Sequence, residues 1–224
     1  DEVPSRGLGD VYKRQSDTSD ESLATASEQL RDKLNVLDTV SSTERYVEGL
    51  VMLNQQQQVE AATLLGIEIN QSIYRDKLSE HLIAGNLDQL RDQPYSAVIG
   101  RLLAQQLSVT VGDSIEVVVP RIFTTPLGPR TRSRSLTVIG VFEVGAEIDS
   151  TLLFTNLDTA SRLLVLPAAA TGIAVFTDNP FVNPQAIEDL VASENRNNPS
   201  ITFEQQQWTK TVSYTHLRAH ETVL

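Results

Sequence analysis

Residues 110–164 constrain the fold most, because two strongly β-forming runs here flank a segment rich in proline, glycine and arginine. The first run is SIEVVV at residues 114–119 and the second is LTVIGVFEV at residues 136–144. Both runs are rich in Val and Ile and are bounded by turn residues, as strands require. The pattern predicts a long hairpin in which the intervening PRIFTTPLGPRTRSRS, residues 120–135, forms a tongue that projects beyond its own sheet.

The tongue is predicted to be unpaired and suited to docking. Pro126 and Pro129 cannot donate ladder hydrogen bonds and Gly128 permits a sharp turn, so strand pairing is expected to stop there. The chain carries a net charge of −11, yet residues 117–142 contain no acidic residue. A partner with an acidic or apolar face is therefore favoured and nucleic acid is not. The side chains behind this prediction are Ile122, Phe123 and Leu127 with Arg121, Arg130, Arg132 and Arg134.

Signals for enzymatic chemistry are sparse. The chain has no cysteine, and outside its last thirteen residues His81 is its one histidine. A nucleophile turn of the Gly-x-Ser-x-Gly type and a phosphate-cradling glycine loop are both missing from the sequence. Glu143, Glu147 and Asp149 share parity on a segment expected to be extended, which suggests either paired carboxylates of a hydrolase or a solvated strand face. We expect no catalytic residue, no cofactor and no metal.

The two ends differ from the interior. Residues 1–15 and 212–224 have no sustained apolar period, and their sequences resemble translated sequencing-adapter read-through. We expect a non-native leader and a non-native tail around a domain at residues 16–211. His216 and His220 have the spacing of helical zinc ligands, but they lie in this tail and are set aside with it.

The interior predicts an α+β fold, since helices and strands alternate without the regular order of a parallel nucleotide-binding sheet. Two lobes are expected. Apolar periodicity and capping residues predict helices at residues 20–34, 73–83, 101–107, 157–164 and 185–192. Extended segments are expected at residues 36–40, 45–53, 59–69, 96–99, 114–119, 136–144, 151–155, 171–177 and 201–203.

Several sequence segments within about residues 50–211 resemble segments of a known family and occur in the same order as in that family. They are Gly66-Ile67, AVIGRLLAQQLSVTVGDSIEVVVP at residues 97–120, TPLG at residues 125–128, VIGVFEVGAEIDSTLLFTNLDTASRLL at residues 138–164, TGIAVFTDNPF at residues 171–181 and QWT at residues 207–209. In these phrases the chain resembles the periplasmic domain of the LolC/LolE family, the transmembrane subunits of the lipoprotein-releasing ABC transporter. The AEID phrase at residues 146–149 favours a LolC-like member, and a merged LolC/LolE-type subunit is the alternative.

The resemblance implies a MacB-like periplasmic core domain with a porter lobe from both ends of the segment, an inserted sabre lobe and a protruding β-hairpin hook. It places the domain on the periplasmic side of the bacterial inner membrane. The implied partners are a LolA-type periplasmic lipoprotein chaperone, an ATPase subunit, a second permease subunit and the lipoprotein substrate. The implied hook is residues 120–131, with chaperone-binding positions at Pro120, Ile122, Phe123, Thr125, Pro126, Leu127, Gly128 and Pro129.

The resemblance also implies a polar pad near the base of the hook, at Arg134 and Ser133. Arg134 matches an arginine of the family, whereas Ser133 stands where a glutamine is usual and Glu116 where another arginine is usual. Two alternatives remain at this point. One is a MacB-like efflux permease domain that transmits ATPase motion to a partner, and the other is a carboxylate-based hydrolase.

Overall fold

The computed structural model describes residues 7–14, 20–70, 72–125, 128–166, 170–177, 185–197 and 202–207. Helices and strands mix along the chain, which confirms the predicted α+β class. The chain divides into two compact units. Unit 1 is Asp1–Arg45 with Thr171–Leu224, and unit 2 is Tyr46–Ala170. The boundary after Arg45 falls inside one strand, β2 (Val40–Gln55).

Unit 1 interleaves two strand–helix–strand segments, one from each end of the chain. The first segment is β1 (Gly7–Arg14), α1 (Asp20–Asn35) and the start of β2. The second is β9 (Gly172–Thr177), α7 (Gln185–Asn197) and β10 (Thr202–Gln207). Their strand order is β10-β1-β9-β2, and β1 is antiparallel to both β9 and β10. Among the described residues this is the split β-α-β arrangement, with unit 2 inserted between β2 and β9.

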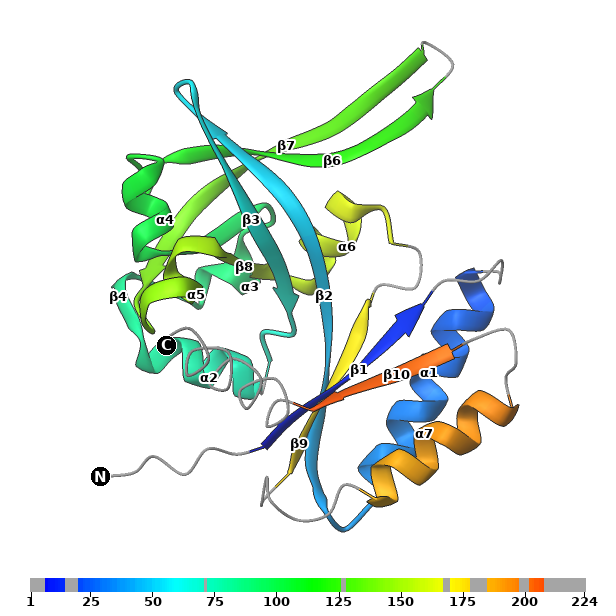
Figure 1. Ribbon diagram of the computed structural model, residues 1–224. Coiled ribbons are helices and arrows are strands. Elements are labelled where there is room, and N and C mark those ends of the chain that lie inside the picture. Colours follow the sequence, from blue (N-terminus) through cyan, green and yellow to red (C-terminus); the bar gives the residue numbers. More distant parts are fainter. Residues whose placement is uncertain are drawn as a thin grey trace, which may run out of the picture. The chain divides into compact units, whose positions relative to one another are not determined.

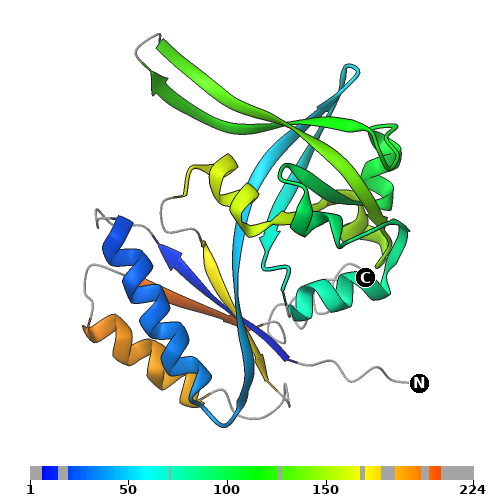
Figure 2. The ribbon, with the colours of Figure 1, turned by 180° about the vertical axis from the view of Figure 1, so that it is seen from behind.

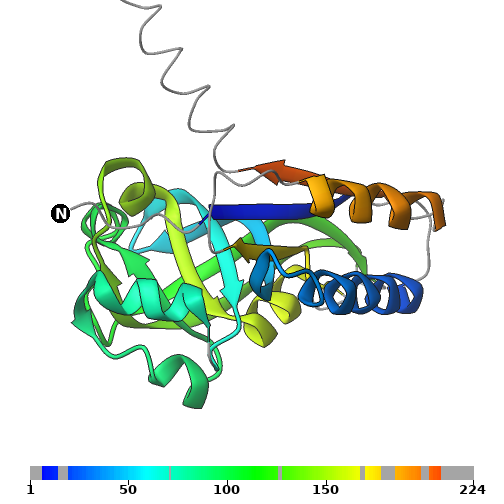
Figure 3. The same cartoon turned by 90° about the horizontal axis from the view of Figure 1, so that it is seen from below.

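The helices of unit 1 pack on its sheet. Figure 3 shows α7 beside β10 and α1 beside β9, and the two helices also touch each other. The predicted helix at residues 20–34 is confirmed, and its Ala26, Leu30 and Leu34 are buried. At the end of α7, Asn195 donates from Nδ2 to the Phe203 carbonyl at 2.9 Å and accepts from the Phe203 N–H at 2.7 Å. This exchange fixes the helix end to β10.

One strand of this sheet was not expected. Residues 1–15 were expected to be a non-native leader and no strand was predicted in them, but Gly7–Arg14 form β1, which lies between β9 and β10. Asp10, for example, lies opposite Ala174 on one side and Gln206 on the other. The strand is defined by backbone pairing with residues more than 150 positions away in the sequence. Local apolar periodicity therefore gives no sign of it.

Six strands of unit 2 form a closed ring. They are the rest of β2, β3 (Gln58–Ile67), β8 (Leu152–Asn156), β5 (Ser96–Gly100), β7 (Gly128–Phe142) and β6 (Ser114–Thr125). Pairing runs β2-β3-β8-β5-β7, and β6 pairs with both β7 and β2, so in the described part of the chain the order forms a ring. β4 (Leu82–Gly85) lies outside this ring, on an edge of β7.

Two hydrophobic clusters stabilise unit 2. The first takes alternate residues from the strands of the ring, together with α4 (Arg101–Gln106) and α6 (Leu157–Leu164). The second lies on the opposite face of β5, β7 and β8, under α2 (Ile73–Glu80) and α3 (Gln89–Asp92), where Phe142 and Phe154 meet edge to face at 5.3 Å. Fully buried members of the first cluster include Val51, Leu53, Leu64, Ile99, Leu103, Val117, Leu136, Leu153 and Leu163.

Glycine permits one close approach in this packing. A Cβ at Gly66 of β3 would lie 2.3 Å from the Ala160 Cβ of α6, so the helix can lie against the strand only if position 66 has no side chain. The predicted cap of α6 is confirmed, since the Asn156 Oδ1 accepts from the Thr159 N–H at 2.7 Å.

Tertiary pairing overrides the local pattern at several positions. The helix predicted at residues 73–83 ends at Glu80, because the chain then pairs with β7, where Leu82 lies opposite Phe142. Gly85 does have a left-handed φ of 92°, but it ends β4 rather than a helix. The extended segment predicted at residues 36–40 is a turn up to the start of β2 at Val40.

The turn between β2 and β3 is tight. It is a two-residue turn in which Gln56 and Gln57 have φ values of 47° and 76°. Positive φ at both central residues is typical of a type I′ hairpin turn, a conformation that favours Asn-Gly over two glutamines. Backbone strain is therefore stored at this tip.

Candidate functional site

The β6–β7 hairpin is the candidate site, and its ladder is longer than expected. β6 and β7 are paired as antiparallel strands from Ser114↔Thr137 to Thr125↔Gly128. The prediction that pairing stops at the prolines was therefore wrong. Figures 1 and 2 show that the outer part of this hairpin extends beyond the other strands of unit 2, as the tongue was predicted to do.

Pro120 explains where the hairpin leaves the rest of the sheet. β6 pairs with β2 at Met52↔Val118, and two residues further this register would place Leu50 opposite Pro120. Pro120 has no N–H to donate to a ladder, and the β6–β2 pairs end two residues before it, at Val118. The β6–β7 register also shifts between Val119 and Ile122, which is a bulge at the same point. Beyond it, the described β6 residues pair with β7 alone, and on such a two-stranded ribbon a proline facing outwards is tolerated.

The register places the predicted hook residues on this ribbon. Pro120 is exposed at the bulge. Pro126 and Leu127 lie outside the described residues. The remaining predicted positions lie on β6 at Ile122, Phe123 and Thr125 and on β7 at Gly128 and Pro129.

The two predicted pad residues lie on opposite faces of the hairpin. Arg134 is exposed and pairs with Val117, whereas Ser133 is half-buried and pairs with Val118. Since paired residues share a face and neighbours in a strand alternate, the two side chains point to opposite sides of the sheet. The two residues are neighbours in the sequence, but the structure places their side chains on different surfaces.

The extended segment that was predicted to carry Glu143, Glu147 and Asp149 contains a helix instead. α5 (Ala146–Thr151) replaces the expected extended segment, so the parity argument was wrong. Asp149 is buried and accepts from the backbone N–H groups of Val144 at 2.8 Å and Gly145 at 3.1 Å. Glu143 is exposed and pairs with Arg101 at 2.8 Å between Oε1 and Nε. Asp149 therefore holds the loop before α5, a structural role the sequence analysis missed.

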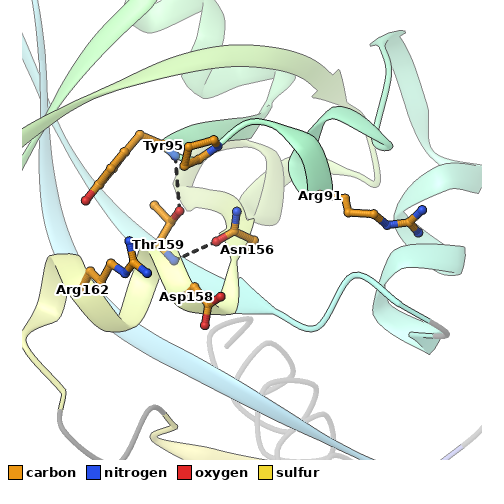
Figure 4. Close-up of a pocket in the computed structure, with 7 residues that line it drawn as sticks. Arg91, Tyr95, Asn156, Asp158, Thr159 and Arg162 are labelled. Carbon is orange, nitrogen blue, oxygen red and sulfur yellow. Dashed lines mark hydrogen bonds between the residues drawn. The ribbon is translucent and has the colours of Figure 1, made fainter.

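A small hollow in unit 2 was not predicted. Its volume is about 140 Å³ and Figure 4 shows the residues that line it. The Tyr95 N–H donates to the Thr159 Oγ1 at 3.3 Å, and the Asn156 Nδ2 donates to the Leu90 carbonyl at 2.9 Å. These bonds join the residue before β5 to α6 and the end of β8 to α3. The wall consists of Arg91, Pro94, Tyr95, Asn156, Asp158, Thr159 and Arg162.

The described residues contain neither a metal-binding cluster nor a helix that could span a membrane. Within the described ranges, no group of three His, Cys, Asp or Glu residues is placed to hold a metal ion. His81 is an exposed residue at the turn after α2, and the tail residues His216 and His220 lie outside the described residues. None of the helices that the structure describes has the length and apolarity needed to cross a membrane.

The chain has relatives in one family. It matches the model of the MacB-like periplasmic core domain over residues 2–193. It is 34% identical over 126 residues to the lipoprotein-releasing system transmembrane protein LolC of Xylella fastidiosa, covering 56% of this chain and 30% of that protein. It is 25% identical over 178 residues to the protein of the same name from Haemophilus influenzae, covering 76% and 44%. The chain thus spans less than half the length of these relatives.

Two solved structures share the fold. The periplasmic region of MacB from Actinobacillus actinomycetemcomitans superposes with a TM-score of 0.58 at 16% identity, covering 93% of this chain and 91% of that one. The extracellular domain of the ABC-type transporter YknZ from Gram-positive bacteria gives a TM-score of 0.53 at 13% identity, covering 88% and 99%. At this identity the likeness concerns the fold, and it agrees with the α+β class.

Proposed function

Because the chain belongs to the MacB-like periplasmic core domain family, we propose that it is the periplasmic domain of an ABC transporter permease subunit that releases lipoproteins from the bacterial inner membrane. In this role it docks a LolA-type periplasmic lipoprotein chaperone. The domain is non-catalytic, and ATP hydrolysis belongs to a separate subunit. The names of the LolC relatives support the transport class.

The β6–β7 hairpin is the observation that carries the docking proposal. Beyond Val118 its described residues pair only within the hairpin, so its outer part is not committed to the ring of strands. The same segment has arginines and apolar residues but no acid, in a chain with a net charge of −11. An apolar tip flanked by arginines suits a chaperone with an apolar opening that shields acyl chains. Residues 120–131 therefore serve as the hook.

Arg134 contributes a charge beside this hook. It is exposed on the hairpin, four residues from the β7 partner of Phe123. We assign it to attraction of the chaperone, with Ser133 as a polar contact on the other face. Unit 1 then corresponds to the porter lobe and unit 2 to the sabre lobe. ATP-driven motion elsewhere in the complex, with the ATPase and a second permease subunit, moves these lobes while the hook holds the chaperone ready for the lipoprotein.

Binding of the chaperone to the whole 224-residue chain tests this function. The whole chain is used because β1 lies inside the sheet of unit 1. We expect saturable binding that is lost when Thr124–Gly128 is deleted, while circular dichroism and the unfolding midpoint stay the same. As a matched control, replacing the Gln56-Gln57 turn of the neighbouring hairpin by Asn-Gly should leave binding intact. If a well-folded chain does not bind, or if the deletion binds as tightly as wild type, the chaperone assignment is wrong and efflux by a MacB-like permease becomes the better explanation.

A further inference from the structure

The small hollow in unit 2 is separate from the hairpin and has charged walls. It lies among α3, the chain before β5 and α6, and neither β6 nor β7 contributes a lining residue. Its volume of about 140 Å³ is below the roughly 300–1,000 Å³ of sites for drug-sized molecules, so a ligand here must be small. Figure 4 shows that α6 supplies Asp158, Thr159 and Arg162 to the wall.

Two opposite charges on α6 line the hollow without pairing. Asp158 lies in the first turn of the helix and Arg162 in its last turn, four residues later. An acid four residues before a base on a helix surface ordinarily forms an ion pair with it. Both residues are exposed, and within the described residues neither side chain takes part in a hydrogen bond or an ion pair. The hollow therefore offers a carboxylate and a guanidinium that are both available to a third group.

A residue with a strained backbone forms another part of the wall. Tyr95 has a left-handed φ of 58°, a conformation that bulky side chains rarely adopt. Two bonds hold it there, since its N–H donates to the Thr159 Oγ1 at 3.3 Å and its carbonyl accepts from the Thr137 N–H at 2.9 Å. The half-buried ring packs partly on the first hydrophobic cluster. Strained residues of this kind concentrate at ligand sites, and here the strain fixes an aromatic ring beside the two charges.

The other polar residues of the wall divide into structural and available groups. Asn156 is structural, because its amide bonds both the Thr159 N–H and the Leu90 carbonyl. Arg91 points away from the other labelled residues in Figure 4. Thr159 is 3% exposed, and its hydroxyl accepts from the Tyr95 N–H and keeps its own proton to donate. The groups available to a ligand are therefore the two charges of α6, the Thr159 hydroxyl and the phenol of Tyr95.

We propose that this hollow binds a small zwitterion, a molecule in which an ammonium group and an oxyanion are separated by a few bonds. The guanidinium of Arg162 donates to the oxyanion, a carboxylate or a phosphate, and the Thr159 hydroxyl adds a further donor. The ammonium group pairs with the Asp158 carboxylate and lies against the ring of Tyr95. A ligand with only one charge satisfies one of the two α6 side chains and meets the other as a like charge.

This inference goes beyond the proposed function, because the hollow and the hairpin share no residue. Failure of the chaperone to bind would leave the zwitterion site standing. Two sources supply the required chemistry, free α-amino acids and the phosphoethanolamine headgroup of a lipid. L-serine represents the first source and O-phosphoethanolamine the second.

Saturation-transfer NMR on the whole 224-residue chain measures the binding of both probes. Two analogues of serine serve as controls at equal ionic strength: 3-hydroxypropionate lacks the ammonium group, and ethanolamine lacks the carboxylate. At least one zwitterion should bind about tenfold more tightly than the analogues, since each analogue loses one charged contact. Binding of serine alone would assign the amino-acid source, and binding of O-phosphoethanolamine alone the headgroup. Equal binding of a zwitterion and its one-charge analogue, or no binding of either zwitterion, would overturn the proposal.

Substitutions on α6 locate the site. Arg162→Gln and Asp158→Asn should each weaken binding of the zwitterion about tenfold, with the unfolding midpoint close to that of wild type because both residues are exposed. Arg196→Gln is the matched control, since Arg196 is likewise an exposed arginine in the last turn of a helix, α7 of unit 1. It should bind as wild type. Wild-type affinity of Arg162→Gln or Asp158→Asn, or an equal loss in Arg196→Gln, would overturn the assignment to the hollow.

Discussion

The two hairpins of unit 2 share a sheet but differ in what surrounds their strands. In β2–β3, each strand has a further partner for part of its length, since β2 pairs with β6 and β3 with β8. In β6–β7, the strands beyond Val118 pair only with each other among the described residues. A proline and a register shift mark the change. A strand that loses its second neighbour exposes backbone and side chains, so the outer part of β6–β7 is accessible for the docking role proposed above, whereas β2–β3 is committed to the sheet.

The largest expected difference between the hairpins is in stability. Leu53 in β2 is fully buried, and Leu53→Ala should lower the free energy of unfolding by about 2–5 kcal/mol through lost burial and a cavity. Thr131 is exposed in the outer part of β7, and Thr131→Ala should change it by less than about 0.5 kcal/mol. Denaturant unfolding of both variants measures this. Equal losses would contradict the independence of the outer hairpin from the core.

The turn of β2–β3 gives an effect of the opposite sign. Replacing Gln56-Gln57 by Asn-Gly should raise the free energy of unfolding by about 1–2 kcal/mol, because both positions have positive φ. Gln57→Val should lower it, since a β-branched residue tolerates this region poorly. The unfolding midpoints of the two variants, compared with wild type, measure the strain. A destabilised Asn-Gly variant would mean that the glutamine side chains make contacts that outweigh the strain.

The N-cap of α6 provides a change that should affect the stability of the ring but not chaperone binding by the hairpin. Asn156→Ala should cost about 1 kcal/mol of stability, because the Thr159 N–H loses its acceptor. Asn156→Ser, which keeps an acceptor for the Thr159 N–H and, like Ala, lacks the amide that donates to the Leu90 carbonyl, should cost less. Since α6 packs on β3 rather than on the outer part of the hairpin, chaperone affinity should be the same in all three proteins. Weaker binding by Asn156→Ala at unchanged fold content would show that docking depends on the ring as well.

The smallest expected effect belongs to the exposed arginine of the hairpin. Arg134→Glu should weaken chaperone binding by roughly 0.5–1 kcal/mol at low salt, and the loss should shrink as salt is added. Stability should not change, because the side chain is exposed. Titrations at two ionic strengths provide the measurement. If affinity and its salt dependence match wild type, the pad role of Arg134 has no support.

Local signals predicted many elements of this fold. The apolar spacing of α1 and the Asn156 cap of α6 describe interactions within a few residues, and both elements form where expected. β1 and β4 were missed because their partners are distant in sequence. α5 was missed because a buried Asp149, bonded to two backbone N–H groups, fixes the preceding loop. The closing β2–β6 pairing is likewise a tertiary contact with no local pattern.

Sequence composition located the candidate site, and the strand register of the structure then showed which face of the hairpin each side chain occupies. The arginines, prolines and missing acids of residues 117–142 were visible in the sequence. Which face each side chain occupies depends on the bulge after Val119 and on the pairing with β2, which composition does not contain. The family resemblance grouped Arg134 and Ser133 as one pad, whereas the register places the two residues on opposite faces.

Photo-crosslinking tests the docking role of the hairpin most directly. A photoreactive residue is placed at Thr124 in the hairpin, and in a separate protein at Ile83 on β4, which is exposed elsewhere in unit 2. Each protein is irradiated with a LolA-type chaperone. Our account predicts a crosslinked product from position 124 and none from position 83. Crosslinking at position 83 without any at position 124 would contradict it, because the chaperone would then bind the domain away from the hairpin.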